Sequence, residues 1–364
     1  MKKTLLLSAA LVLGLTACSG GAASSVKTGT VQTQTSVQND VPGDGPASSE
    51  AGIDAFSDAP TVKMQFAENQ PSTSSVGINA EEFCKKVAER TGNTVQIEFY
   101  GDALLGDEAS VIGGIEAGTI EFTRVNASAL QATVPEVGVL TLPYLYKDNA
   151  HCYRVLNSDV GDDLLARCQD HGFVGLRLSG GNKDNKPSGF RSFYAATPIN
   201  SVADLKGKKI RVQESEVVIK MVEALGGVAT PMAYGEVFQA LQTGVIDIAE
   251  NDPSSYYQSG HYEVAKYYTR DNHQLNVSMY IMSQKAYDAM TEAQRTVFLE
   301  CLDEYLEKNS DDVAVNIEEF EKKAVESGCE FIDVDTASFQ EACQSVYDMF
   351  PDYSEMLERI RAID

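Results

Sequence analysis

Residues 235–251 read GEVFQALQTGVIDIAEN and carry the clearest fold signal in the chain. A Gly-Glu pair opens a helical segment that ends at Gly244, and the residues that follow predict a strand running to Asn251. The same order occurs at residues 106–126, GDEASVIGGIEAGTIEFTRVN, where the strand ends at Asn126. This repeated unit favours an α/β fold with two similar lobes, although helix–glycine–strand is also a common idiom of α/β proteins in general.

Two asparagines and one arginine are the first candidates for a ligand site. Ligands of open α/β sheets bind in the crevice at the carboxyl ends of the strands, where Asn126 and Asn251 are expected. Arg211 stands inside the apolar strand 210–212, where a charge needs a partner. Its guanidinium could bind a ligand carboxylate through two charge-assisted hydrogen bonds, or it could pair with a protein carboxylate such as Glu236.

The regions around these segments predict a scaffold of further helices and strands. A capping box of Thr291 and Gln294 begins a long helical region that we expect to break at residues 309–312. The other predicted elements are a helix over 80–88 capped by Asn79, a strand over 95–99, a short strand over 331–334 and helix over 339–360.

The length of the chain indicates its number of domains, and its charge excludes one class of partner. The chain has 364 residues, which suits about two domains, and its 53 acidic and 29 basic side chains give a net charge of −24. Because nucleic-acid binding depends on a basic footprint that neutralises phosphates, we expect no nucleic-acid partner.

The N-terminal residues indicate export. Lys2 and Lys3 precede the apolar run 5–15, which is too short for a membrane span. The run ends in Leu-Thr-Ala-Cys, which resembles a bacterial lipobox and makes Cys18 the lipidated first residue of the mature protein. The alternative is an ordinary signal peptide that happens to contain Cys18.

These observations predict three regions. Residues 1–18 form a lipoprotein signal peptide, and residues 19–60 form a disordered tether, because they hold few large apolar side chains. Residues 61–364 form the folded domain. The protein is therefore expected outside the cytoplasm, anchored to the membrane by its lipid and monomeric.

Catalytic and metal-binding motifs are missing. No histidine is followed by Glu, so H-E-x-x-H is excluded, and no C-x-x-C pair or Walker A motif occurs. We expect no cofactor and no metal, and a binding protein rather than an enzyme. The six cysteines after Cys18 could form disulfides or remain buried thiols. Two other classes stay open: an exported enzyme that uses a pair of carboxylates, and a surface adhesin or scaffold.

Several motifs together resemble the TRAP (tripartite ATP-independent periplasmic) solute-binding proteins, over about residues 61–350. The matching segments are DLKGKKIRV at 204–212, PMAYGEVFQALQTGVID at 231–247, AEN at 249–251, LGDE at 105–108 and LPY at 142–144. The resemblance implies two α/β lobes, as in periplasmic binding proteins, joined by hinge strands and a long hinge helix. The lobes would close over an organic anion, and the closed form would dock on the membrane subunits of a TRAP transporter.

Further segments resemble the hexuronate-binding branch of this family. They are ENQP at 68–71, TRV at 123–125, FRSFY at 190–194 and YEVAKYY at 262–268. The resemblance implies D-glucuronate or D-galacturonate as ligand, with a C4-dicarboxylate or another carboxylate as alternatives. The chain departs from this branch at residues 180–187 and at Asp252-Pro253.

The resemblance also assigns roles to residues. The family arginine that clamps the ligand carboxylate falls on Arg211, a second family arginine falls on Arg191, and the pocket asparagine falls on Asn251. We expect Arg124 either to bind sugar oxygens or to pair with Glu108. The full set of predicted ligand-binding residues is Arg211, Arg191, Asn251, Asn126, Glu108, Arg124, Gln70, Tyr234 and His273.

Overall fold

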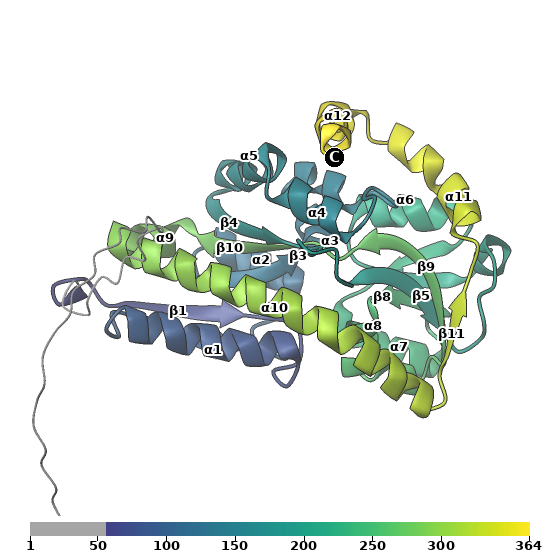
Figure 1. The fold of residues 1–364 in the computed structure, drawn as a ribbon, viewed down its shortest axis with the longest axis horizontal. Helices are drawn as coiled ribbons and strands as arrows, with labels where there is room; N and C mark the ends of the chain where they lie inside the picture. Colours follow the sequence, from purple (N-terminus) through teal and green to yellow (C-terminus); the bar gives the residue numbers. More distant parts are fainter. Residues whose placement is uncertain (1–55) are drawn as a thin grey trace, which may run out of the picture. The chain divides into compact units, whose positions relative to one another are not determined.

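The computed structural model describes residues 56–364, which fold around two mixed β-sheets (Figure 1). The first sheet has the order β2-β1-β3-β10-β4, with β1 Val62–Ala67, β2 Val95–Tyr100, β3 Phe122–Asn126, β10 Ser278–Ser283 and β4 Phe173–Ser179. The second has the order β11-β9-β5-β8-β6-β7, with β11 Glu330–Asp333, β9 Tyr267–Leu275, β5 Phe190–Ala195, β8 Ile248–Asn251, β6 Lys209–Val212 and β7 Val228–Pro231.

Each sheet contains one of the two repeated units. Helix α2 (Glu108–Glu116) leads to β3, which pairs parallel with β1, and α7 (Val237–Thr243) leads to β8, which pairs parallel with β6. Gly244 ends α7 in the left-handed conformation at φ 72°, which suits glycine because it has no Cβ. The predicted α/β fold with two lobes is confirmed.

The chain crosses between the two sheets three times. Residues 180–189 join β4 to β5, and only Asn276 and Val277 separate β9 from β10. The third crossing is α10 (Glu292–Glu326), which packs against α1 (Ser75–Arg90) and also against α8 (Pro253–Gln258). These crossings are the hinge strands and hinge helix that the family resemblance implies.

Helix α10 begins at the predicted capping box but does not break at residues 309–312. Short polar side chains often end helices because they bond to their own backbone. Here Asn309 and Asp312 instead accept hydrogen bonds from the Nδ2 of Asn79 on α1, at 2.6 and 2.8 Å. The same contacts correct the predicted cap, since Asn79 is buried inside α1 and Ser74 caps the helix by accepting from the Gly77 N–H.

The remaining helices cover the sheets and connect the strands. They are α3 Ala127–Leu130, α4 Asn149–Leu156, α5 Asp159–Arg167, α6 Glu216–Ala224, α9 Gln284–Ala289, α11 Thr336–Asp348 and α12 Ser354–Ala362. The helix predicted over 339–360 is therefore two helices. A short turn that starts at Pro351 separates them, because proline cannot continue a helix that precedes it.

The folded domain includes residues that precede the predicted boundary at residue 61. Phe56 is buried in the core beside β1 and α1, so at least residues 56–60 belong to the folded domain. The predicted signal peptide, Cys18 and the tether up to residue 55 lie outside the described residues. The six cysteines within the described part are buried free thiols.

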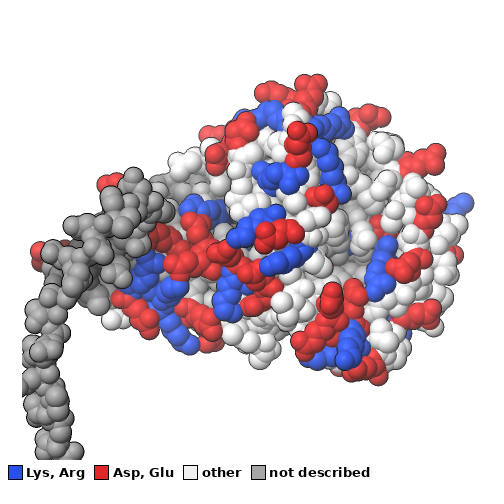
Figure 2. Space-filling view, viewed as in Figure 1, with Lys and Arg blue, Asp and Glu red and all other residues white. Residues whose placement is uncertain are grey.

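The surface carries interspersed acidic and basic side chains, as Figure 2 shows for the face that α10 crosses. Several of these are paired, such as Arg177 with Asp303 at 2.6 Å and Lys186 with Asp311 at 2.9 Å. None of the helices in residues 56–364 is long and apolar enough to cross a membrane.

Candidate functional site

One small cavity is lined by residues from both lobes. Its lining consists of Asn69, Gln70, Glu108, Arg124, Asn126, Arg191, Arg211, Gln213, Tyr234, Asn251 and Asn276. Every predicted ligand-binding residue except His273 is in this set. Asn126 and Asn251 are the last residues of β3 and β8, which belong to different sheets, so strand ends from both sheets meet at this cavity.

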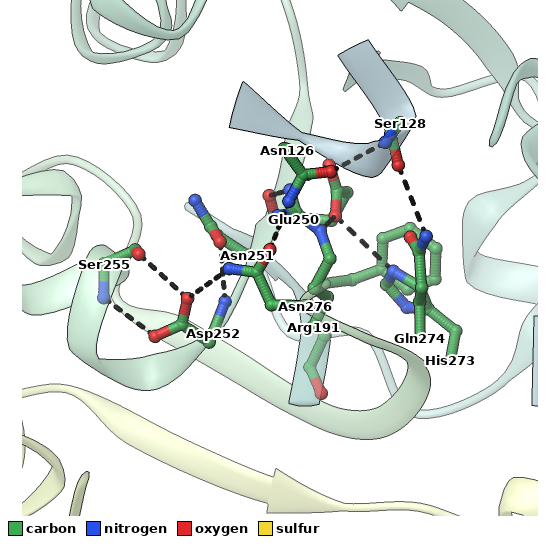
Figure 3. A network of polar contacts seen from close by, with 12 residues as sticks. Asn126, Ser128, Arg191, Glu250, Asn251, Asp252, Ser255, His273, Gln274 and Asn276 are labelled. Atoms are coloured by element: carbon green, nitrogen blue, oxygen red, sulfur yellow. Dashed lines mark hydrogen bonds and ion pairs between the residues drawn. The ribbon is translucent and has the colours of Figure 1, made fainter. Parts of the chain in front are cut away.

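Arg191, which lines this cavity, is bound by a protein carboxylate (Figure 3). It lies on β5 beside Glu250 of β8, and the Nη2 of Arg191 donates to Oε1 of Glu250 at 2.7 Å and to its backbone carbonyl at 3.1 Å. Both side chains are buried. Burial alone would raise the pKa of Glu250, but Arg191 and His273 outweigh it and lower this pKa to about 2.

His273 contacts Glu250 of this pair and is not one of the residues that line the cavity. Its side chain is fully buried, its Nδ1 lies 2.8 Å from Oδ2 of Asp271, and its Nε2 lies 3.5 Å from Oε2 of Glu250. Burial would lower the pKa of His273, but the two carboxylates outweigh it and raise this pKa to about 9. The prediction that His273 contacts the ligand is therefore corrected: it is positioned to hold Glu250, and through it Arg191.

Arg211 differs from Arg191 because no carboxylate is bound closely to it. Its Nε and Nη2 donate to the backbone carbonyl of Met232 at 3.1 and 2.8 Å. The nearest carboxylate oxygen of the described chain belongs to Glu250, 3.9 Å away, and Arg191 already holds that group. The suggested partner Glu236 is exposed at the surface.

The charge of Arg211 is consequently poorly compensated. Burial lowers its pKa, and the neighbouring Arg191 adds to this effect, while Glu250 opposes it. Two of the five N–H donors of the guanidinium are used by Met232. A buried guanidinium with free donors next to a cavity is an anion-binding group.

Arg124 is paired, but with a residue that the sequence analysis did not select. Its Nε donates to Oε2 of Glu68 at 2.7 Å, and its Nη1 donates to the Ser278 hydroxyl at 2.9 Å. A second contact joins its Nη2 to Oε1 of Glu68 at 2.5 Å, so the pair is bidentate. Of the two roles expected for Arg124, the pairing with Glu108 is replaced by the pairing with Glu68, and contact with sugar oxygens stays a prediction. Glu68 directly follows β1, and its place at a strand end was a usable signal.

Glu108 and the cavity amides are held by the backbone. The Asn126 N–H donates to Oε1 of Glu108 at 2.8 Å, and burial raises the pKa of this carboxyl group. The Asn126 amide accepts from the Ser128 N–H at 2.9 Å and donates to the side chain of Asn276. Asn251 accepts from the Asp252 N–H at 2.9 Å. These bonds fix each amide while leaving part of it free to contact a ligand.

Gln70 and Tyr234 also line the cavity. The Gln70 N–H donates to Oε1 of Glu68 at 3.0 Å, and the Tyr234 hydroxyl bonds to the Ser259 hydroxyl at 2.6 Å. The Tyr234 ring centre lies 5.8 Å from the guanidinium carbon of Arg211.

Three further lining residues were not among the predicted ligand-binding residues, although Asn69 lies in the ENQP segment. Asn69 and Gln213 each carry a buried side-chain oxygen that meets no hydrogen-bond partner within residues 56–364. Asn276 lies between β9 and β10 and donates to Oδ2 of Asp252 at 3.2 Å. An unpartnered buried polar atom is costly, so a cavity with such atoms favours a polar ligand.

No group of three or more metal-ligating side chains is clustered in the part of the chain that the structure describes.

Comparison with known proteins gives consistent matches. The model of the family "Bacterial extracellular solute-binding protein, family 7" matches residues 66–352. A solute-binding protein of Chromohalobacter salexigens is 32% identical over 282 residues, which cover 77% of this chain and 82% of that protein.

Two solved structures resemble the fold closely. A TRAP periplasmic solute-binding protein from Xanthobacter autotrophicus Py2 with bound β-D-galacturonate has a TM-score of 0.76 and 34% identity, over 83% of this chain and 100% of that one. Another from Pseudomonas putida F1 with bound D-glucuronate has a TM-score of 0.78 and 30% identity, over 83% of this chain and 98% of that one.

Proposed function

The chain belongs to the bacterial extracellular solute-binding proteins of family 7, the solute-binding subunits of TRAP transporters, and we propose that it captures a hexuronate through Arg211. D-Glucuronate and D-galacturonate are the proposed ligands. The observation that carries this proposal is the charge of Arg211, which is buried beside a polar cavity and lies 3.9 Å from a carboxylate already bound to Arg191.

The charges around the cavity favour a ligand with one carboxylate. Glu68 compensates Arg124, and Glu250 compensates Arg191, so both arginines have a protein partner. Arg211 remains as the one poorly compensated cation among the arginines of the lining, and a single ligand carboxylate would neutralise it.

The other lining groups suit the hydroxyls of a sugar acid. Asn126, Asn251, Gln70 and Glu108 offer both donors and acceptors, which a hydroxyl can use together. A plain dicarboxylate would instead require a second free cation. The hexuronates bound in the two solved relatives support the same ligand class.

The proposal also covers what the protein does to its ligand, where it acts and which partner it meets. The protein binds its ligand and returns it unchanged, as a transport subunit rather than an enzyme. It acts as a monomer outside the cytoplasm, where a lipid on Cys18 anchors it to the membrane. The liganded form docks on the membrane subunits of a TRAP transporter.

Ligand binding can be tested by thermal unfolding with acidic and neutral sugars. A ligand that binds only the folded protein stabilises it by about 4 kcal/mol at a thousandfold excess over Kd. Glucuronate or galacturonate should therefore raise Tm clearly, while glucose and galactose should not. Arg211→Lys keeps the charge but loses the planar guanidinium, so affinity should fall, and Arg211→Ala should abolish the shift.

Arg270→Ala is the matched control, because Arg270 also lies on a strand of the second sheet but pairs with Glu321 and Asp333 away from the cavity. The clamp role is refuted if Arg211→Ala has a native circular dichroism spectrum and binds the acid like the wild type. Consumption of the sugar acid during long incubation, followed by NMR, would instead support the enzyme alternative.

A further inference from the structure

A second cavity adjoins the first. Gln70, Arg124 and Asn276 line both cavities, so their side chains form the boundary between the two. The second cavity extends from this boundary toward the middle of α10, and it also meets the N-terminus of α1 and the start of α8. It does not include Arg211, which lines the first cavity on another side.

Most of the residues that line the second cavity have short polar side chains, and few of them are charged. Its side chains are mostly serines, asparagines and glutamines, and the glycines at 180, 181 and 189 expose backbone groups. Arg124 and Asp252 are the charged members, and both are engaged. Arg124 binds Glu68, while Asp252 accepts from Asn276 at 3.2 Å and from the Ser255 hydroxyl at 2.8 Å. Such a lining suits a neutral ligand with several hydroxyls.

One buried hydroxyl in this lining lacks a partner. Ser254 is 6% exposed, and its Oγ has no hydrogen-bond partner among the described residues. Buried hydroxyls are normally hydrogen-bonded, because leaving one unpaired costs free energy. A ligand hydroxyl in the second cavity would provide the missing partner.

A third cavity adjoins the first on the side of Arg211, but its lining carries more charge. The carboxyl groups of Asp107, Glu108 and Glu214 line it, together with Arg211 itself. The second cavity has only Arg124 and Asp252 as charged members, and both are engaged, so it is the better site for a neutral sugar unit.

We propose that the second cavity is a subsite for a second, neutral sugar unit, so that the protein accepts a hexuronate glycosidically linked to another sugar. This inference rests on the proposed function, because Arg211 must hold the uronate carboxylate. In a pyranuronate the carboxylate is attached at C5, and C1 is not adjacent to C5 in the ring. The ring oxygen separates C1 from C5, so the anomeric oxygen and the carboxylate leave the ring in different directions. With the carboxylate at Arg211, the proposal places the anomeric oxygen toward Gln70, Arg124 and Asn276, which line both cavities.

The test compares three ligands by isothermal titration calorimetry. These are methyl β-D-glucuronide, the acidic disaccharide 4-O-β-D-glucuronosyl-D-glucose, and its neutral counterpart cellobiose. The acidic disaccharide should bind about tenfold more tightly than the methyl glycoside, or about 1.4 kcal/mol. Cellobiose should not bind, because it has no carboxylate for Arg211.

Variants connect the gain to the cavity. Val76 lines the second cavity and is half-buried, so Val76→Trp should fill the space and remove the gain for the disaccharide while leaving the methyl glycoside unaffected. Ile78→Trp is the matched control, because Ile78 lies on the same helix but is 51% exposed and outside the cavity. Ser254→Ala should weaken disaccharide binding about fivefold through the lost hydrogen bond.

The outcomes separate this inference from the proposed function. If methyl β-D-glucuronide and glucuronate bind but the disaccharide binds no more tightly, the subsite is refuted and the proposed function stands. Equal effects of Val76→Trp and Ile78→Trp on the disaccharide would also refute the subsite. If no uronate binds while another carboxylate does, the proposed function fails and this inference fails with it.

Discussion

Arg211 and Glu250 lie 3.9 Å apart, measured from Nη1 to Oε1, while Arg191 holds the same carboxylate at 2.7 Å. One buried carboxylate thus faces two buried guanidinium groups, and His273 approaches it from behind at 3.5 Å. The unequal distances explain how two arginines in one cavity can differ in role. The closer one is part of the scaffold, and the more distant one is available to a ligand.

Glu250→Gln should strongly destabilise the protein. Removing this charge leaves Arg191 and His273 buried beside a neutral amide, and breaking a buried ion pair in this way costs about 3–5 kcal/mol. Urea unfolding monitored by circular dichroism measures the loss. Glu214→Gln is the control, since Glu214 is exposed and should change stability little. A Glu250→Gln variant as stable as the control would contradict the assigned network.

Stability should fall as the pH rises above neutrality because of His273. Its pKa is raised from 6.5 to about 9, so its stabilising contribution is fully present below pH 6.5 and is lost as the pH rises through 9. A difference of this size corresponds to about 3 kcal/mol. Unfolding free energies between pH 6 and pH 9.5 should therefore decline in the wild type and decline much less in His273→Gln. His171→Gln should keep the wild-type pH dependence, and identical profiles for all three proteins would exclude this contribution.

Stability should also fall in acid, through Glu250. The folded pKa of about 2 lies below the ordinary 4.5, so the stabilisation is present above pH 4.5 and is lost as the pH falls toward 2. Urea unfolding at pH 6, 4 and 3 would measure the decline in unfolding free energy. A parallel measurement on Glu214→Gln, which loses an exposed charge but keeps Glu250, should give the wild-type decline.

Asn79→Ala should weaken the contact between α1 and α10. The Nδ2 of Asn79 donates to Asn309 and Asp312, and its Oδ1 accepts from the Lys308 ammonium at 2.5 Å. Losing these partly buried bonds should cost about 1–3 kcal/mol in unfolding free energy. Gln96→Ala, at an exposed position of β2, is the comparison. If both variants unfold at the same urea concentration, the helix contact contributes nothing measurable.

Cys18→Ser should release the protein from the membrane or leave it unprocessed. This follows from the proposal that Cys18 is lipidated, because loss of the acyl chains removes the anchor. Partitioning into a detergent phase gives the readout. Partitioning unchanged by the substitution would contradict the lipoprotein assignment.

Sequence reasoning located the fold and most of the cavity because these depend on local order. Strand ends are readable from alternation followed by a turn, so Asn126 and Asn251 could be placed at the carboxyl ends of β3 and β8 before any contact was known. Arg211 was identifiable because a charge interrupts an apolar strand. The repeated unit and the motifs that resemble TRAP solute-binding proteins together predicted the two lobes.

The partners of these residues could not be read in the same way. Glu250 lies 59 residues from Arg191, and Glu68 lies 56 residues from Arg124, so each pairing depends on which strands become neighbours. The sequence offers many acidic side chains, and it does not show which of them is buried beside a given arginine. The same reason applies to Asn79, whose contacts on α10 turned an expected helix break into a continuous helix.

The short connection between β9 and β10 has a mechanical consequence. Asn276 is one of its two residues, and its side chain bonds to Asn126 at the end of β3 and to Asp252 just after β8 (Figure 3). A rotation of one sheet against the other must be absorbed by the three crossings, at 180–189, at 276–277 and in α10, and it must pull Asn276 away from Asn126 or from Asp252. Asn276 also lines the ligand cavity. The connection between the two lobes therefore contributes a side chain to the ligand cavity. A ligand that hydrogen-bonds to Asn276 competes with the bonds of Asn276 to Asn126 and Asp252, and so affects the relative rotation of the lobes.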